Sequence, residues 1–165
     1  MQNLILIGMM GSGKTSVGKV LSAKLAYKHV DTDDLVVSMN GFSISDIFKT
    51  AGEAKFRELE AAVLDKLSCL EHVVISTGGG IVLNPVNAMK LKNMGTVIYL
   101  KASSDQLEKN LENEKLTRPL LATQSIASIL MVRNSLYEQL ADFVVETDGK
   151  SIDEIATLIL LEHEK

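Results

Sequence analysis

The sequence predicts an α/β protein in which a parallel β-sheet carries helices on both faces. Five short runs rich in β-branched residues alternate with stretches whose apolar residues recur at helical spacing. The first run, "NLILIG" at 3–8, is apolar without alternation, which is typical of a strand covered on both faces. Strands separated by helices form βαβ units, and the strands of such units run parallel.

Each element can be assigned in order along the chain. Strands are predicted at 3–8, 29–33, 73–77, 96–100 and 143–147. Helices are predicted at 14–27, 53–70, 86–93, 104–112, 126–141 and 151–163. Apolar residues share one side of the helix at 14–27 (Val17, Val20, Leu21 and Leu25) and of the helix at 53–70 (Phe56, Leu59, Val63 and Leu67).

A polar stretch at 112–124 interrupts this pattern. It contains one of the two prolines and links two predicted helices. It is either a solvated loop or a lid, because long loops in compact domains often cover a site.

Size and composition indicate one globular domain over residues 1–165. The chain is 46% hydrophobic and 23% charged, with a net charge of −4. This balance argues against a nucleic-acid or anionic-membrane surface. No apolar run approaches the roughly 18 residues of a membrane span, and the start is too short and uncharged for a signal peptide, so a cytoplasmic location is expected. The single Cys69 cannot form an internal disulfide and is expected to be a small buried or half-buried side chain.

The segment "GMMGSGKT", residues 8–15, predicts a nucleoside triphosphate site. It matches G-x-x-x-x-G-K-[ST] between an apolar strand and a helix. Backbone amides and the helix N-terminus can hold phosphates, Lys14 can reach the β- and γ-phosphates, and the Thr15 hydroxyl can ligate Mg²⁺. No N-K-x-D or D-x-x-G stretch of a guanine-binding switch occurs, and the chain is short for a motor. A small kinase with a second pocket for its acceptor is therefore favoured.

The segment "DTDD", residues 31–34, supplies carboxylates at the end of a predicted strand. Strand alternation would put Asp31 and Asp33 on one face, at the sheet edge where open α/β folds bind ligands. Alternatively, Asp33 or Asp34 simply caps the following helix. A phosphotransferase uses two such carboxylates, one near Mg²⁺ and one to orient or deprotonate a hydroxyl, so the functional interpretation is favoured.

Two arginines are further candidates. Arg57 lies one helical turn from Glu60, which continues the apolar stripe of its helix and should point partly inward. The two either form a surface ion pair or a buried pair that leaves Arg57 donors free for an anion. Arg133 falls on the apolar face of its helix, so it either extends to the rim or binds something inside.

Three consecutive glycines, Gly78, Gly79 and Gly80, directly follow the strand at 73–77. Each costs roughly 0.5–1 kcal/mol of backbone entropy relative to alanine. Such a run at a strand end suggests that something must approach the backbone closely.

Taken together, these motifs resemble the shikimate kinase family over nearly the whole chain. The resemblance rests on residues 8–15, "DTD" at 31–33, "SISDIF" at 43–48, "GEAKFRELE" at 52–60, "STGGG" at 76–80, "TRPLL" at 117–121 and "RNSLYEQLA" at 133–141. It implies ATP-dependent phosphorylation of the 3-hydroxyl of shikimate with Mg²⁺, on the route to aromatic amino acids.

The resemblance also implies residue roles. Arg57 and Arg133 would bind the substrate carboxylate, and the Gly78–Gly80 amides would face the substrate. Asp33 would contact the hydroxyl as the base, while Thr15, and Asp31 through water, would hold Mg²⁺. Lys14 and Arg118 would act on the phosphates. The ATP-binding set would be Gly11, Ser12, Gly13, Lys14, Thr15, Ser16 and Arg118.

The architecture implied by the resemblance is the NMP-kinase-like three-layer fold of P-loop NTPases, with strand order 2-3-1-4-5. A substrate-binding region would span about 31–60 and a lid about 112–124, and a monomer is expected. Lys109 and Asn110 depart from the family, which often has an arginine there to stack on adenine. The alternatives are another small-molecule kinase of this fold, such as a gluconate kinase, or a regulatory protein that binds nucleotide without chemistry.

Overall fold

The structure, a computed structural model, describes residues 2–113 and 118–165 and contains a five-stranded parallel sheet. The strands are β1 (Asn3–Ile7), β2 (Lys28–Asp31), β3 (Val73–Ser76), β4 (Gly95–Lys101) and β5 (Phe143–Glu146). Their order is β2-β3-β1-β4-β5, and every neighbouring pair is parallel. The predicted fold class and strand order are confirmed.

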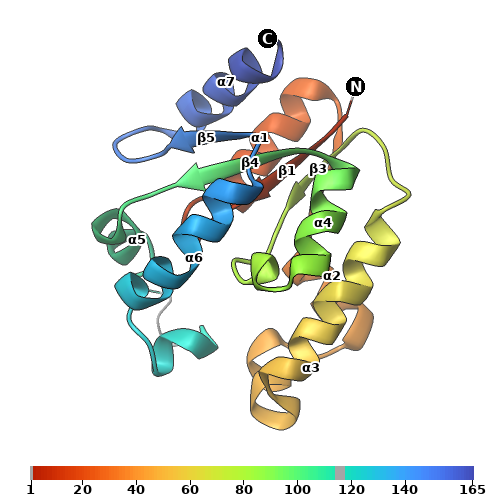
Figure 1. Cartoon of the computed structure of the whole chain (residues 1–165), viewed down its shortest axis with the longest axis vertical. Helices are drawn as coiled ribbons and strands as arrows, with labels where there is room; N and C mark the ends of the chain where they lie inside the picture. Colours follow the sequence, from red (N-terminus) through yellow and green to blue (C-terminus); the bar gives the residue numbers. More distant parts are fainter. Residues whose placement is uncertain (1, 114–117) are drawn as a thin grey trace.

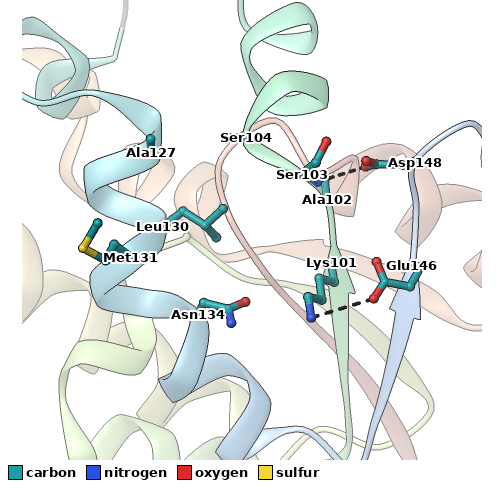
Figure 2. A pocket seen from close by; sticks show the side chains of 10 residues that line it. All are labelled: Lys101, Ala102, Ser103, Ser104, Ala127, Leu130, Met131, Asn134, Glu146 and Asp148. Carbon is teal, nitrogen blue, oxygen red and sulfur yellow. Dashed lines mark hydrogen bonds and ion pairs between the residues drawn. The ribbon is translucent and has the colours of Figure 1, made fainter.

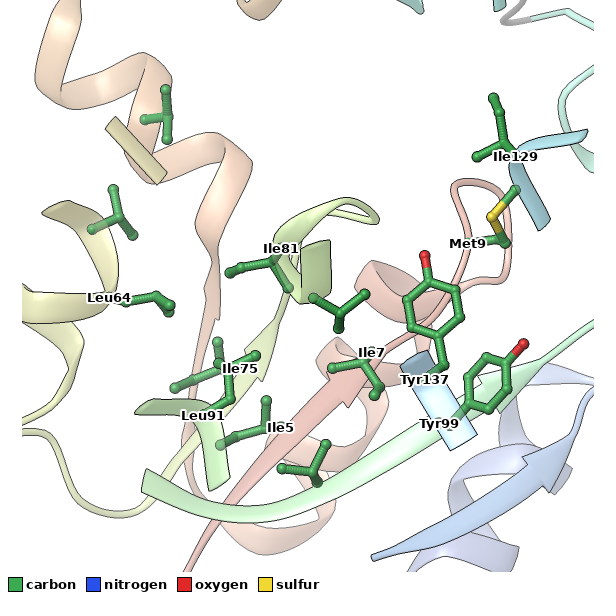
Figure 3. Packing of buried hydrophobic residues seen from close by; sticks show 14 of the residues in the cluster. Ile5, Ile7, Met9, Leu64, Ile75, Ile81, Leu91, Tyr99, Ile129 and Tyr137 are labelled. Atoms are coloured by element: carbon green, nitrogen blue, oxygen red, sulfur yellow. The ribbon is translucent and has the colours of Figure 1, made fainter. Parts of the chain in front are cut away.

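Helices cover both faces of the sheet (Figure 1). On one face, α1 (Lys14–Leu25) and α7 (Ile152–His163) pack against β1 through Leu4 and Leu6. On the other face, Ile5 and Ile7 belong to a larger core. This larger core, part of which is drawn in Figure 3, includes residues from α3 (Ile44–Leu67), α4 (Pro85–Met94), α5 (Ser104–Asn110) and α6 (Ile126–Leu140). The unbroken apolar run of β1 is thus explained by burial on both sides.

Helix α2 (Thr32–Asn40) and the first turns of α3 are not among the helices predicted in order along the chain, although a helix after residues 31–34 was one alternative there. Strand β2 ends at Asp31, whose side chain accepts hydrogen bonds from the backbone of the next turn and so starts α2. Gly41, at a φ of 75°, ends α2, and Ser43 caps α3. Gly52 then breaks the helical geometry of α3, with φ 82° and ψ 172°. Because these caps and the kink lie close together, the helical segments between them are too short to show a clear repeat of apolar residues in the sequence.

Two loops bear on the sequence predictions. The Cys69 side chain is exposed, so the expectation of burial was wrong: α3 ends at Leu67, and the cysteine lies in the turn beyond the helix. Of the predicted lid at 112–124, residues 114–117 lie outside the described residues, and Pro119–Ala122 form one 3₁₀ turn.

Among the helices in the described ranges, none is long and apolar enough to span a membrane.

Candidate active site

The Gly-rich loop joins β1 to α1, as the sequence predicted, and its lysine lies along it. The Lys14 Nζ donates to the carbonyls of Gly8 at 2.8 Å and Met9 at 2.7 Å. Burial lowers the pKa of Lys14 to about 8, although the nearby Asp33 carboxylate opposes this change. The Lys14 side chain therefore folds back along the loop, and its ammonium binds two loop carbonyls close to the N-terminus of α1.

A cavity of about 570 Å³ opens beside this loop. It is lined by residues predicted to bind ATP or metal, namely Gly11, Gly13, Lys14, Thr15, Ser16, Asp31 and Arg118, and also by Asp33, the predicted base. Ser12 is buried within the loop, with its Oγ 3.5 Å from the Lys14 Nζ. The volume and the polar lining suit a nucleoside triphosphate.

The two residues predicted to hold the metal lie in direct contact. The Thr15 hydroxyl donates to the Asp31 Oδ2 at 2.6 Å, while the other Asp31 oxygen accepts from the Asp33 amide at 2.9 Å. A hydroxyl and one carboxylate fit Mg²⁺, which keeps several waters and takes its remaining ligands from phosphates. Within the described part of the chain, no cluster of three or more His, Cys, Asp or Glu could hold a metal by itself.

Asp33 reaches the site for a different reason from the one the sequence suggested. It belongs to the first turn of α2, so strand alternation does not apply to it, and the helix cap is Asp31, not Asp33 or Asp34. Even so, Asp31 and Asp33 both line the nucleotide cavity. Burial raises the pKa of Asp33, and the Asp31 carboxylate adds to this rise.

A second, smaller pocket of about 140 Å³ adjoins the first. It contains all the residues predicted to bind the acceptor, namely Asp33, Arg57, Gly78, Gly79, Gly80 and Arg133. Asp33 and Arg118 line both cavities, so they lie where the two spaces meet. A phosphate in one cavity and a hydroxyl in the other would be neighbours at this point.

The three glycines are explained by side chains that pack against their backbone. A Cβ on Gly78 would lie 2.7 Å from an Asp33 carboxylate oxygen, and one on Gly80 would overlap the Arg57 guanidinium. A Cβ on Gly79 would lie 3.3 Å from the Arg133 guanidinium. The loop thus leaves room for the protein's own charged side chains, in addition to any ligand.

Arg57 and Glu60 form an ion pair in which Glu60 is buried, as the helical stripe suggested, and Arg57 is half-buried. Glu60 has no exposed surface, and its Oε2 accepts from the Arg57 Nη1 at 3.0 Å. Arg57 also pairs with Glu53 at 3.0 Å. Burial raises the pKa of Glu60 to about 7, against the opposing effect of Arg57. Its second oxygen, Oε1, is buried without a hydrogen-bond partner in the described structure.

Arg133 is 4% exposed, so it does not extend to the rim of α6. It lines the acceptor pocket together with residues of α3. The sequence did not identify the apolar wall of this pocket, which includes Phe48 and Phe56, with ring centroids 5.1 Å apart. The stripe in the helix at 53–70 contained Phe56, but Phe48 lies in the part of α3 that was not expected.

Where the resemblance led to the expectation of an arginine, the chain has Lys109 and Asn110. The Asn110 Nδ2 donates to the Gly11 carbonyl at 2.8 Å, and the Asn110 Oδ1 accepts from Gln106 at 2.9 Å. Asn110 lines the nucleotide cavity, whereas Lys109 is exposed and is not among the lining residues. The asparagine is therefore anchored to the phosphate loop.

A third hollow, of about 480 Å³, lies at the carboxyl ends of β4 and β5 beside α6 (Figure 2). Its Lys101 pairs with Glu146 at 3.8 Å, and its Asp148 accepts from the Ser103 amide at 3.0 Å. It contains none of the predicted site residues. The candidate site is therefore the pair of joined cavities.

Known proteins resemble this chain over nearly its whole length. The family model for shikimate kinase matches residues 10–164. A shikimate kinase of Caldanaerobacter subterraneus is 41% identical over 164 residues, covering 97% of this chain and 95% of the relative. One of Caldicellulosiruptor bescii is 43% identical over 152 residues, covering 90% and 87%.

Solved structures give the same result. The shikimate kinase of Acinetobacter baumannii, determined in complex with shikimate, superposes with a TM-score of 0.95 at 31% identity, covering 99% of this chain and 93% of that one. The enzyme of Aquifex aeolicus superposes with a TM-score of 0.85 at 36% identity, covering 99% and 96%. The chain belongs to the shikimate kinase family.

Proposed function

We propose that this protein transfers the γ-phosphoryl group of ATP to the 3-hydroxyl of shikimate. The observation that carries this proposal is the junction of a nucleotide cavity and a small acceptor pocket at Asp33 and Arg118. Family membership supports the same reaction. A single catalytic domain that acts as a cytoplasmic monomer is part of the proposal.

The acceptor is held by charge. Arg57 and Arg133 line the pocket, and together they can bind the shikimate carboxylate through charge-assisted hydrogen bonds. The Gly79 and Gly80 amides line the same pocket and can donate to the ring hydroxyls. Neither amide donates a hydrogen bond to any residue that the structure describes.

Asp33 is the proposed base. Its buried Oδ1 has no hydrogen-bond partner among the described residues, so it can accept the proton of the attacking 3-hydroxyl. The raised pKa of Asp33 makes this carboxylate a better proton acceptor than an exposed aspartate. Deprotonation and orientation of the hydroxyl would both follow from this one contact.

The phosphates are held by the loop. Amides at the start of α1 and the Lys14 ammonium can bind the β- and γ-phosphates, and Arg118 can contact the transferred group from the junction. Thr15, and Asp31 through water, would hold Mg²⁺. When bound, Mg²⁺ would neutralise charge on the phosphate oxygens.

An acceptor panel tests this function. ADP release should require shikimate and Mg²⁺ together with ATP, and gluconate and nucleoside monophosphates should not replace shikimate. Equal turnover with gluconate would favour the alternative small-molecule kinase. ADP release that does not depend on any acceptor would favour a nucleotide hydrolase, and ATP binding without ADP release would favour a regulatory protein without chemistry.

A further inference from the structure

Tyr137, on α6, contacts the glycine loop that follows β3. Its side chain has no exposed surface, and its hydroxyl donates to the Gly79 carbonyl at 2.5 Å. The two residues are 58 positions apart in the chain. The contact therefore joins a helix of the acceptor pocket to the loop that lines the same pocket.

The geometry of the peptide group makes this contact directional. The Gly79 carbonyl and the Gly80 amide belong to one planar trans peptide, so they point in opposite directions and rotate together. Three consecutive glycines have more backbone freedom than any other tripeptide, and the loop has no side chain of its own to limit rotation. A hydrogen bond that fixes the carbonyl also fixes the direction of the amide.

We propose that Tyr137 is a positioning residue for the acceptor: its hydroxyl holds the Gly79–Gly80 peptide so that the Gly80 amide faces the substrate hydroxyls. This proposal rests on the proposed function. Tyr137 does not line the acceptor pocket, and its hydroxyl contacts the loop that does. The Arg133 side chain also interacts with Tyr137, and the glycine amide signals distinguish an effect through the loop from one through this arginine. Arg133, one helical turn earlier on α6, lies close to Gly79 as well, so the same helix supplies both the carboxylate-binding cation and the contact that holds the loop.

The ring of Tyr137 has a packing role that can be separated from the hydroxyl. It lies against Tyr99, with ring centroids 4.9 Å apart, in the larger core (Figure 3). The Tyr99 hydroxyl donates to the Asn134 Oδ1 at 2.9 Å. Asn134 lies on α6 and not in the glycine loop. Tyr99 is therefore a matched control, because phenylalanine at either position removes one hydroxyl and one hydrogen bond from the same tyrosine pair.

The experiment compares Tyr137→Phe with Tyr99→Phe. Both variants should lower the Tm by similar amounts, because each loses one buried hydrogen bond. Only Tyr137→Phe should weaken shikimate binding, by about three- to tenfold, with ATP affinity changed less than about twofold. In protein labelled with ¹⁵N-glycine, Tyr137→Phe should shift the Gly79 and Gly80 amide signals in the absence of any ligand, and Tyr99→Phe should not.

Other outcomes would overturn the proposal. These are equal shikimate affinities in the two variants, unchanged Gly79 and Gly80 signals, or an equal loss of ATP affinity in Tyr137→Phe. A Tyr137→Phe protein that does not fold, beside a folded Tyr99→Phe protein, would show that the hydroxyl holds the core, and would also contradict it. If the unmodified protein bound no shikimate, the proposed function would fail, yet the glycine signals would still decide whether the hydroxyl holds the loop.

Discussion

At the scale of single residues, the site is made of charges that burial brings together. Arg133 and Glu60 could be identified from the sequence because each interrupts an otherwise apolar helical stripe, and both are buried. Asp33 was identified from an incorrect argument, since it lies in a helix and not in a strand. The capping role of Asp31 could not be distinguished from its neighbours because Asp31, Asp33 and Asp34 are all residues that favour helix starts.

Asp33→Asn should keep the fold and ATP affinity but lower kcat by about 100-fold or more, because an amide cannot accept the hydroxyl proton. Steady-state kinetics with separate ATP titrations measure this. A kcat within a few-fold of the unmodified protein would reduce Asp33 to a positioning group.

Arg133→Met should weaken shikimate binding by about 10- to 150-fold, because a buried charge-assisted contact is lost. Arg133→Lys should restore only part of this affinity, since an ammonium cannot form the bidentate contact. Binding titrations with shikimate and with ATP measure the two effects separately, and ATP affinity should barely change. Unchanged shikimate affinity in Arg133→Met would remove Arg133 from the acceptor site.

Glu60→Gln tests the buried carboxyl through pH. The pKa of Glu60 is raised from an ordinary 4.5 to about 7. Between pH 4.5 and pH 7, the folded protein therefore keeps a proton on Glu60 that the unfolded chain has lost. This contribution to stability is complete below pH 4.5 and is lost as the pH rises through 7. Glutamine at position 60 does not titrate, so Glu60→Gln does not lose this contribution. The free energy of unfolding of Glu60→Gln minus that of the unmodified protein should therefore be larger at pH 8 than at pH 5, by up to about 3 kcal/mol.

Urea unfolding at the two pH values measures this change. Glu58→Gln is the matched control, because Glu58 is an exposed glutamate of the same helix, paired with Lys55 at 3.1 Å. The control should change little with pH. A Glu60→Gln difference that is the same at pH 5 and pH 8 would mean that Glu60 is ionised throughout this range.

At the scale of elements, two packing relations position the site. Leu111 lies so close to Gly11 that a Cβ on this glycine would be 2.7 Å from the leucine side chain, and Asn110 binds the Gly11 carbonyl. The end of α5 thus rests on the phosphate loop. On the other side of the site, α6 contacts the glycine loop through Tyr137. Neither relation could be predicted from the sequence, because each joins segments about 60 to 100 residues apart without a local pattern.

Asn110→Ala should weaken ATP binding by about three- to tenfold, since the Gly11 carbonyl loses its partner, and should leave shikimate affinity nearly unchanged. Selectivity for ATP over GTP should be loose in the unmodified protein, because neither Lys109 nor Asn110 offers a guanidinium plane to the base. Nucleotide titrations measure both quantities. A strong preference for ATP that persists in Asn110→Ala would show that another segment recognises adenine.

At the scale of the whole molecule, the site lies where the carboxyl ends of three strands meet. The phosphate loop follows β1, Asp31 ends β2, and the glycine loop follows β3. The parallel α/β class could be predicted from alternating patterns, but the strand order came only with the family resemblance. Local sequence does not specify which strands become neighbours, and the short helix α2 between two caps left no periodicity to detect.

The most direct test of the account identifies the product. The purified protein is incubated with Mg-ATP and shikimate, and phosphorus-coupled proton NMR locates the phosphate. We expect one equivalent of ADP for each shikimate phosphorylated, with the phosphate on the 3-hydroxyl. ADP formed without phosphorylated shikimate, or a phosphate on a different hydroxyl, would contradict a site in which Asp33 presents that hydroxyl to the nucleotide cavity.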